Sequence, residues 1–128
     1  MLKTSRQCSH TKDSSLLIQV LKHDSVVHVD HVDLDEEVIE TCKEFFKWGS
    51  AWEDPRVSLH IEDGAKFVRE AADGFYDVII QDSSDPWSFE VDGRLVELPS
   101  AVLYEETHFR NMHRILTRNG VLNLQVGS

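Results

Sequence analysis

Several apolar segments of this sequence are followed directly by aspartate residues. Residues 76–86 read YDVIIQDSSDP, so that an apolar run ends at Asp82 and Asp85 with two serines between them. Asp33 ends another β-branched segment, and Asp63 comes two residues after a third. Carboxylates accept hydrogen bonds from hydroxyl and amino groups, and they take up protons from alkylammonium groups, whose pKa in water is about 10.4. The chemistry that these residues allow is the binding of a nucleoside and of an amine.

Alternating helix and strand patterns place these acids at one edge of a sheet. Apolar spacing predicts helices at 14–23, 35–49, 64–72 and 104–116, and β-rich segments predict strands at 25–33, 56–61, 76–81 and 120–126. Gly49 stands where the second helix would have its C-cap, and a polar loop is expected from Asp82 to about Ser100. The order indicates βα units on a doubly wound, mostly parallel α/β sheet, whose ligands bind outside the carboxyl ends of the strands.

A single aspartate at such a position has a simpler explanation. It is commonly a helix N-cap or a turn residue, and Asp35 fits the N-cap of helix 35–49. Four acids that arrive together at the predicted ligand edge favour a binding site instead.

Each acid has a task that suits its position. Asp33 ends the strand after the first helix, where an acid accepts hydrogen bonds from ribose hydroxyls in nucleotide-binding α/β folds. Asp63 lies beside Gly64 at a helix start, where an adenine amino group can approach. Asp82 and Asp85 suit the binding of an ammonium group and the removal of its proton.

Composition narrows the class of protein. The 128 residues suit one globular domain, and 23 acidic against 13 basic residues give a net charge of −10, which argues against a nucleic-acid surface. We find no apolar stretch of the ~20 residues that a membrane span needs, and no secretion signal. Cys8 and Cys42 are too few for a disulfide framework, so we expect reduced cysteines and a cytoplasmic protein.

The histidine and serine residues give weaker indications of a functional site. His28 and His31 are three residues apart on a predicted strand and point to opposite faces, which argues against a metal site. The serines after Asp82 lack a histidine in a recognisable motif, which argues against a hydrolase. We expect His108 and His113 to lie on an outer helix without a special role.

The residues around the acids resemble the spermidine synthases, the polyamine aminopropyltransferase family. YDVIIQDSSDP resembles that family's YDVIITDSSDP, HVDLDEEVIETCKEFF its VDIDEEVIEVSKKFF, HIEDGAKFV its HVGDGFEFV, and NGVLNLQ its DGVLCCQGE. The segments follow in the family's order and cover roughly residues 11–126. The resemblance implies a Rossmann-like, class I methyltransferase-like fold. It also implies transfer of an aminopropyl group from decarboxylated S-adenosylmethionine to putrescine, which gives spermidine and methylthioadenosine.

The resemblance also implies roles for individual residues. Nucleoside binding would fall to Asp33, Asp63, Gly64 and Ser83, with Asp33 at the ribose and Asp63 at the adenine amino group. Asp82 would assist deprotonation of the attacking amine, Asp85 would hold the diamine, and Gln125 would line the amine pocket. Decarboxylated S-adenosylmethionine is the co-substrate, and the reaction implies no metal, cofactor or covalent enzyme intermediate.

The sequence departs from the family in three places. Residues 9–15 read SHTKDSS where the family has a GGGDGG loop, and only Asp13 is kept. We expect residues 1–10 to be poorly structured, residues 11–128 to form a partial catalytic domain, and the sheet to be incomplete at its N- and C-terminal ends. Residues 87–102 form a longer segment than the family's loop.

These departures leave two alternatives to an active aminopropyltransferase. One is a catalytically inactive, truncated relative that binds a nucleoside or pairs with a full-length synthase. The other is an S-adenosylmethionine-dependent methyltransferase of the same fold, against which the retained DSSDP argues. Loss of cover over the sheet is expected to favour association, including homo-oligomers.

Overall fold

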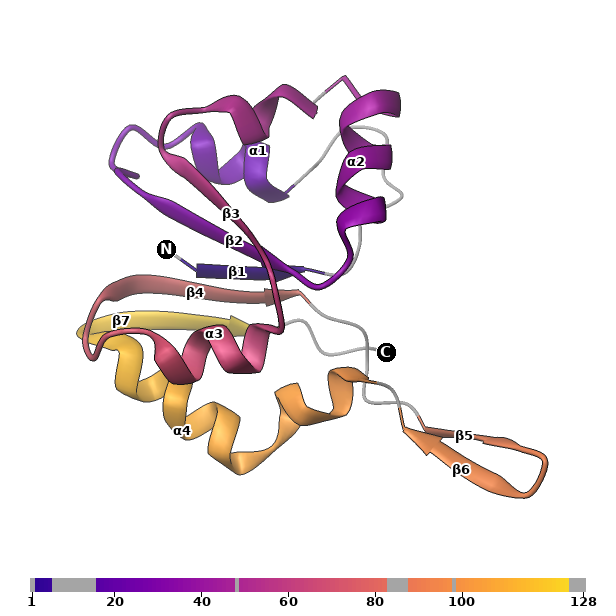
Figure 1. The fold of residues 1–128 in the computed structure, drawn as a ribbon. Helices are drawn as coiled ribbons and strands as arrows, with labels where there is room; N and C mark the ends of the chain where they lie inside the picture. Colours follow the sequence, from indigo (N-terminus) through magenta and orange to yellow (C-terminus); the bar gives the residue numbers. More distant parts are fainter. Residues whose placement is uncertain (1, 6–15, 48, 83–87, 98, 125–128) are drawn as a thin grey trace.

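A five-stranded sheet in the order β3-β2-β1-β4-β7 forms the centre of the molecule, and each adjacent pair of its strands is parallel (Figure 1). The computed structural model describes residues 2–5, 16–47, 49–82, 88–97 and 99–124. The strands are β1 (Leu2–Ser5), β2 (Val29–Asp33), β3 (Val57–Ile61), β4 (Tyr76–Asp82) and β7 (Leu116–Leu124). The helices are α1 (Leu16–Leu21), α2 (Glu36–Phe45), α3 (Gly64–Glu70) and α4 (Glu106–Ile115), with short 3₁₀ segments η1 (Gly49–Glu53) and η2 (Pro99–Tyr104). The predicted doubly wound α/β fold is confirmed.

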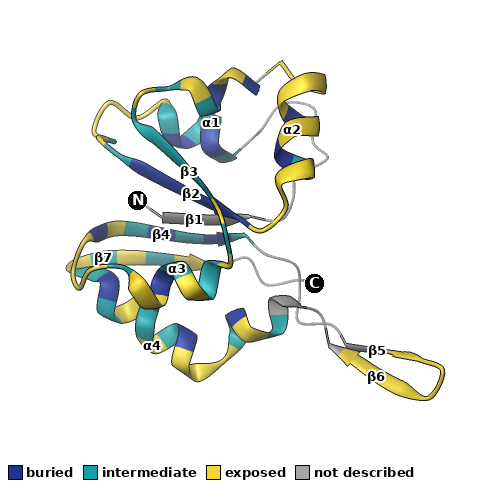
Figure 2. Cartoon of the chain, in the orientation of Figure 1, coloured by how far each residue is buried: buried dark blue, intermediate teal, exposed yellow. Residues whose placement is uncertain are grey.

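Each face of the sheet has its own apolar cluster. On one face, α3 and α4 pack over β2 and β4, and the cluster consists of Val32, Val68, Tyr76, Ile79, Met112 and Ile115. On the other face, α1 and η1 cover the cluster of Leu17, Val20, Val29 and Ala51. All residues of β2 are buried, as expected for a strand that helices cover on both faces (Figure 2).

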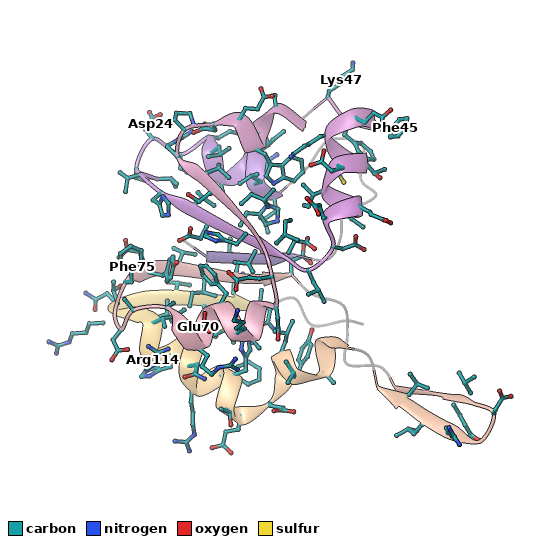
Figure 3. The ribbon with its side chains drawn as sticks, in the orientation of Figure 1. Asp24, Phe45, Lys47, Glu70, Phe75 and Arg114 are labelled. Atoms are coloured by element: carbon teal, nitrogen blue, oxygen red, sulfur yellow. The ribbon has the colours of Figure 1, made fainter. Side chains whose placement is uncertain are left out.

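The second helix starts as the sequence predicts but ends earlier. Asp35 is its N-cap and accepts a hydrogen bond from the backbone N–H of Val38 at 3.2 Å. Its C-cap is Phe46, and Phe45 is 71% exposed at the end of the helix, away from the sheet (Figure 3). Gly49 instead begins η1, where an added Cβ would lie 2.6 Å from the Cα of Lys43. The glycine is therefore required by a close backbone contact and not by a helix cap.

The first strand lies within residues 1–10, where the sequence predicts little structure. Residues 2–5 form β1 in the middle of the sheet, with Leu2 in register with Asp30 on one side and with Ile79 on the other. Residues 1 and 6–10 lie outside the described residues. The strand carries no clear apolar pattern of its own, so its position depends on pairing with two neighbouring strands.

Part of the predicted polar loop is a β-hairpin. Strands β5 (Ser88–Val91) and β6 (Arg94–Glu97) are antiparallel, and Asp92 and Gly93 connect them with positive φ angles of 51° and 75°. Asp-Gly with two positive φ angles is typical of a type I′ hairpin turn. The hairpin projects away from the sheet and its helices (Figure 1). Residues 83–87 and 98 lie outside the described residues.

The last strand begins at Leu116, before the predicted start at residue 120. Tyr76 pairs with Leu116 and Val78 with Val121, so the register shifts between these pairs, and Gly120 lies in the irregularity. The chain therefore passes from α4 into the strand without the expected separate turn.

The state of a cysteine and the length of the helices bear on where the protein is located in the cell. Cys42 is buried and is bonded in a disulfide, which corrects the expectation of reduced cysteines at this position. The cytoplasmic location stays a prediction. Among the described residues, every helix is too short or too polar to cross a membrane.

Candidate functional site

Two of the predicted acids lie level with each other at the carboxyl edge of the sheet. Asp82, at the end of β4, is in register with Ser5 of β1. On the other side of β1, Thr4 is in register with Val32, so Asp33 reaches the same level as Ser5. Two strand spacings of about 4.8 Å place the backbones of Asp33 and Asp82 roughly 9.5 Å apart. The end of β1 lies between them (Figure 1).

Asp33 is a buried carboxylate that does not cap the next helix. It is 4% exposed, and its Oδ1 accepts the backbone N–H of Asp35 at 3.0 Å. Two residues earlier on the same face of β2, His31 accepts a hydrogen bond at Nδ1 from Trp52 Nε1 at 2.8 Å. The planes of the two rings are nearly parallel, with an interplanar angle of 14°. This contact joins η1 to β2 and supports the strand just before Asp33.

Asp63 serves as a helix N-cap, the simpler explanation considered for such residues. Its carboxylate accepts the backbone N–H of Ala65 at 3.0 Å at the start of α3, where Gly64 is the first helical residue. The side chain is exposed, and a carboxylate has about four acceptor positions, so the cap leaves capacity for a ligand. The backbone N–H of Glu62 bonds to the carbonyl of Asp33 at 3.0 Å, which joins this loop to the end of β2.

Asp82 is half-buried, and the residue before it is fixed by a polar network. Gln81 is 1% exposed, and its Nε2 donates to the carbonyl oxygen of Leu103 at 3.1 Å. Its Oε1 lies 2.9 Å from Nε2 of His108, which is 4% exposed. The expectation that His108 has no special role is therefore wrong, whereas His113 is exposed as expected.

The described residues of the predicted site thus meet at one edge. Asp33 and Asp82 end their strands, Asp63 lies in the loop after β3, and Gly64 is the first residue of α3. The other predicted site residues lie outside the described residues: Ser83, Asp85 and Gln125.

A second buried acid, Asp30, is not one of the predicted site residues. Asp30 Oδ2 accepts a hydrogen bond from the hydroxyl of Tyr76 at 2.5 Å, and Oδ1 lies 2.8 Å from His60 Nε2 and 3.1 Å from His28 Nε2. Burial raises the pKa of Asp30. The hydrogen bonds from Tyr76 and His60 and the charge of His28 lower it by more than burial raises it, so the pKa of Asp30 is below its usual value. The cluster joins β2, β3 and β4 inside the sheet.

The two histidines that the sequence raised as metal ligands contact different partners. His28 contacts Asp30 on one face of β2, whereas His31 contacts Trp52 on the other, as the spacing predicted. Among the described residues, no group of three or more His, Cys, Asp or Glu side chains could hold a metal ion.

A pocket of about 720 Å³ lies at the opposite, amino edge of the sheet. It lies between α1, the segment that enters β2 and the first part of β4, and its walls include Leu16, Val20, Val26, Phe75 and Ile80. The three site acids that the structure describes, Asp33, Asp63 and Asp82, do not line it.

Comparison with known proteins gives the family. Residues 12–128 match the spermine/spermidine synthase domain. The chain belongs to the spermine/spermidine synthase family. A polyamine aminopropyltransferase of Prochlorococcus marinus (strain MIT 9215) is 37% identical over 115 residues, which are 88% of this chain and 37% of that protein. Spermidine synthase 1 of Hyoscyamus niger is 38% identical over 117 residues, or 91% of this chain and 34% of that protein.

Solved spermidine synthases share the fold. The crystal structure of a spermidine synthase in complex with the transition-state analogue AdoDATO superposes with a TM-score of 0.76 at 30% identity, over 96% of this chain and 37% of that one. The spermidine synthase of Thermotoga maritima gives a TM-score of 0.75 at 30% identity, over 99% of this chain and 38% of that one. The chain therefore spans a little over a third of the length of these members of the family.

Proposed function

We propose that this chain forms the nucleoside- and amine-binding edge of an aminopropyltransferase, which transfers an aminopropyl group from decarboxylated S-adenosylmethionine to putrescine. The observation that carries the proposal is the position of Asp33 and Asp82 at one level on either side of β1. Asp63 lies in the neighbouring loop. Membership of the spermine/spermidine synthase family supports the reaction class, and the activity, substrates and partners of this chain are part of the proposal.

The nucleoside would lie across the end of β1. Asp33 accepts hydrogen bonds from the ribose hydroxyls, since carboxylates at this point of nucleotide-binding α/β folds have that task. Asp63 accepts a hydrogen bond from the adenine amino group with the acceptor capacity that its N-cap bond leaves. Gly64 and Ser83 line the nucleoside next to these acids.

The amine would be bound and activated by Asp82, at the end of β4, and by Asp85. Asp85 holds one ammonium group of the diamine, Gln125 lines the amine pocket, and Asp82 takes a proton from the other ammonium group. The free amine then attacks the aminopropyl methylene carbon bonded to the sulfonium. The new C–N bond forms as the C–S bond breaks, and the bonding pair stays on sulfur, so that neutral methylthioadenosine leaves and the product nitrogen carries the positive charge.

A second candidate is a relative that binds the nucleoside but does not catalyse. The observation that favours it is the SHTKDSS sequence at residues 9–15, where the family has GGGDGG. Glycines let a backbone approach a ligand closely, and side chains at those positions hinder that approach. For the same reason we expect turnover slower than the ~1 s⁻¹ that is usual for enzymes.

The two candidates separate in one assay on the purified chain. Decarboxylated S-adenosylmethionine and putrescine are incubated with the protein, and spermidine and methylthioadenosine are quantified by chromatography. Equal amounts of both products, formed repeatedly per protein molecule, support the aminopropyltransferase. Methylthioadenosine binding without turnover supports the inactive relative, and absence of both contradicts both candidates.

A further inference from the structure

The side chain directly before Asp82 is a buried amide whose two ends are both occupied. Gln81 donates from Nε2 to the carbonyl oxygen of Leu103 at 3.1 Å, and its Oε1 lies 2.9 Å from His108 Nε2. An amide oxygen only accepts, so His108 Nε2 must carry the hydrogen of this bond. The bond therefore requires one particular tautomer of His108.

The surroundings of His108 favour that neutral tautomer. Burial lowers the pKa of His108, and the negative charge of Asp63 acts against this without reversing it. With the hydrogen on Nε2, Nδ1 of the neutral ring carries none. Nδ1 is buried and has no hydrogen-bond partner among the described residues, so a hydrogen there would be a buried donor without an acceptor.

The pair joins three elements at the carboxyl edge. Gln81 is the penultimate residue of β4, Leu103 lies in η2, and His108 lies in the first turn of α4. The negative charge of Asp63, at the start of α3, also reaches the ring. Two residues that the proposed function uses, Asp82 and Asp63, thus lie on either side of this network.

The buried position of Gln81 accounts for the pair. A glutamine at a position that is 1% exposed requires partners for its amide, and His108 and the Leu103 carbonyl supply them.

We propose that Gln81 and His108 are a pair of positioning residues that hold η2 and α4 against the end of β4 and so fix Asp82 relative to the nucleoside-binding acids. This inference rests on the proposed function. Neither side chain needs to touch the substrate, because Gln81 directly precedes Asp82 in β4 and the bonds of the pair hold η2 and α4 against the end of that strand.

The test uses substitutions of similar shape that remove polar atoms. Gln81→Met alone leaves the Nε2–H of His108 without an acceptor, and His108→Phe alone leaves the Oε1 of Gln81 without a donor. The double variant removes both groups, and like Gln81→Met it leaves the carbonyl oxygen of Leu103 without the donor of Gln81. Loss of one partner of a buried hydrogen bond is costly, whereas replacement of both by apolar groups is close to neutral. His113→Phe, at an exposed position of the same helix, is the matched control.

Three measurements on the full chain report different parts of the inference. The ¹⁵N spectrum of the imidazole should show His108 as the Nε2–H tautomer. Hydrogen exchange at residues 101–104 should be faster in each single variant than in the parent. The dissociation constant of methylthioadenosine should rise about tenfold in each single variant, a ratio that corresponds to about 1.4 kcal/mol. The double variant should bind methylthioadenosine more tightly and exchange more slowly than Gln81→Met, because it no longer buries an unpaired Nε2–H.

The outcomes separate this inference from the proposed function. If methylthioadenosine binds the parent and the double variant is no better than Gln81→Met, the positioning pair is contradicted and the proposed function is not. The same holds if exchange changes while affinity does not, since the pair would then be only structural. If the parent does not bind methylthioadenosine, the proposed function is wrong and the positioning role falls with it. If a single variant fails to fold, the folding of the double variant and its affinity for methylthioadenosine still test the inference.

Discussion

At the scale of single residues, the proposed function gives Asp82 and Asp85 different tasks, so the two should respond differently to substitution. If the chain is active, Asp82→Asn should lower the turnover number by at least the ~10²-fold that loss of a general base causes. Asp85→Asn should mainly raise the KM for putrescine, because it weakens the binding of an ammonium group. Steady-state kinetics measure both effects.

The control for both variants is Asp24→Asn, an exposed carboxylate between α1 and β2, far from the candidate site along the sheet (Figure 3). It should leave both constants unchanged. Full activity of Asp82→Asn would remove Asp82 from the mechanism.

The buried cluster around Asp30 should affect stability and not binding. Tyr76→Phe removes the hydrogen bond to Asp30 Oδ2, and a hydrogen bond to a charged group contributes about 1.5–3 kcal/mol to the free energy of unfolding. Urea unfolding at pH 7 measures this loss. Equal unfolding midpoints for variant and parent would contradict it.

The pH dependence of the same cluster has a definite sign. The pKa of Asp30 in the folded chain is below its ordinary value of 3.8. Its contribution to stability is therefore fully present above pH 3.8 and is lost as the pH falls through the folded-state pKa. The pKa of Tyr76 is raised above 10.0, so its contribution is present below pH 10 and is lost at higher pH. Unfolding curves between pH 2 and 11 should show both losses in the parent, and smaller losses in Tyr76→Phe.

At the scale of elements, Arg114 joins the ends of two helices (Figure 3). Its guanidinium donates to the carbonyl oxygens of Val68 at 2.9 Å and Ala71 at 2.8 Å, which lie at the end of α3, and it also pairs with Asp73. Arg114→Met should lower the free energy of unfolding by about 1–3 kcal/mol, because helix-end carbonyls lose their donors in a partly buried place.

The matched control for Arg114 is Arg110 on the same helix. Its side chain is 78% exposed and pairs with Glu106 four residues away. Arg110→Met should cost less than about 0.5 kcal/mol, as is usual for exposed helix pairs. Equal losses in the two variants would show that Arg114 does not stabilise the end of α3.

The elements that the sequence predicts well are those whose own residues carry the pattern. Helix α3 follows an N-cap aspartate, and β4 has an apolar run that helices cover. Strand β1 lacks such a pattern and is held by its neighbours, so local patterns do not reveal it. The hairpin 88–97 has a local signal in Asp92-Gly93 between β-branched and apolar residues, which the expectation of a polar loop overlooked.

Some features of the candidate site can likewise be predicted from the sequence and others cannot. Acids at strand ends are visible in the sequence, because the edge of a parallel sheet follows from the order of its elements. The bond from His108 to Gln81 spans 27 positions, and the bond from Tyr76 to Asp30 spans 46, so neither follows from local spacing. A glutamine next to Asp82 in a buried strand was the one available sign that a polar partner must exist.

At the scale of the whole molecule, exposed apolar side chains favour association. Leu95 in the hairpin is 70% exposed, and Phe75 and Val121 are 59% and 58% exposed at the sheet. The net charge of −10 opposes contact between copies, and salt screens that repulsion. Light scattering should therefore show a mass that rises from monomer towards dimer between low salt and about 0.5 M salt.

Leu95→Lys tests whether the hairpin takes part in this association. The variant should remain monomeric at salt concentrations where the parent associates, because a charged side chain is not buried easily. A parent that stays monomeric at every salt concentration would contradict the prediction.

The central claim is that the carboxyl edge of the sheet, around Asp33 and Asp82, binds an adenine nucleoside. The most direct measurement is isothermal titration of the purified chain with methylthioadenosine, compared with Asp33→Ala and with the exposed control Glu70→Gln on α3. We predict weak binding by the parent, the same affinity for Glu70→Gln, and no measurable binding by Asp33→Ala, because ribose hydroxyls lose their acceptor. Binding that survives Asp33→Ala at the parent's affinity would place the nucleoside elsewhere and contradict the account.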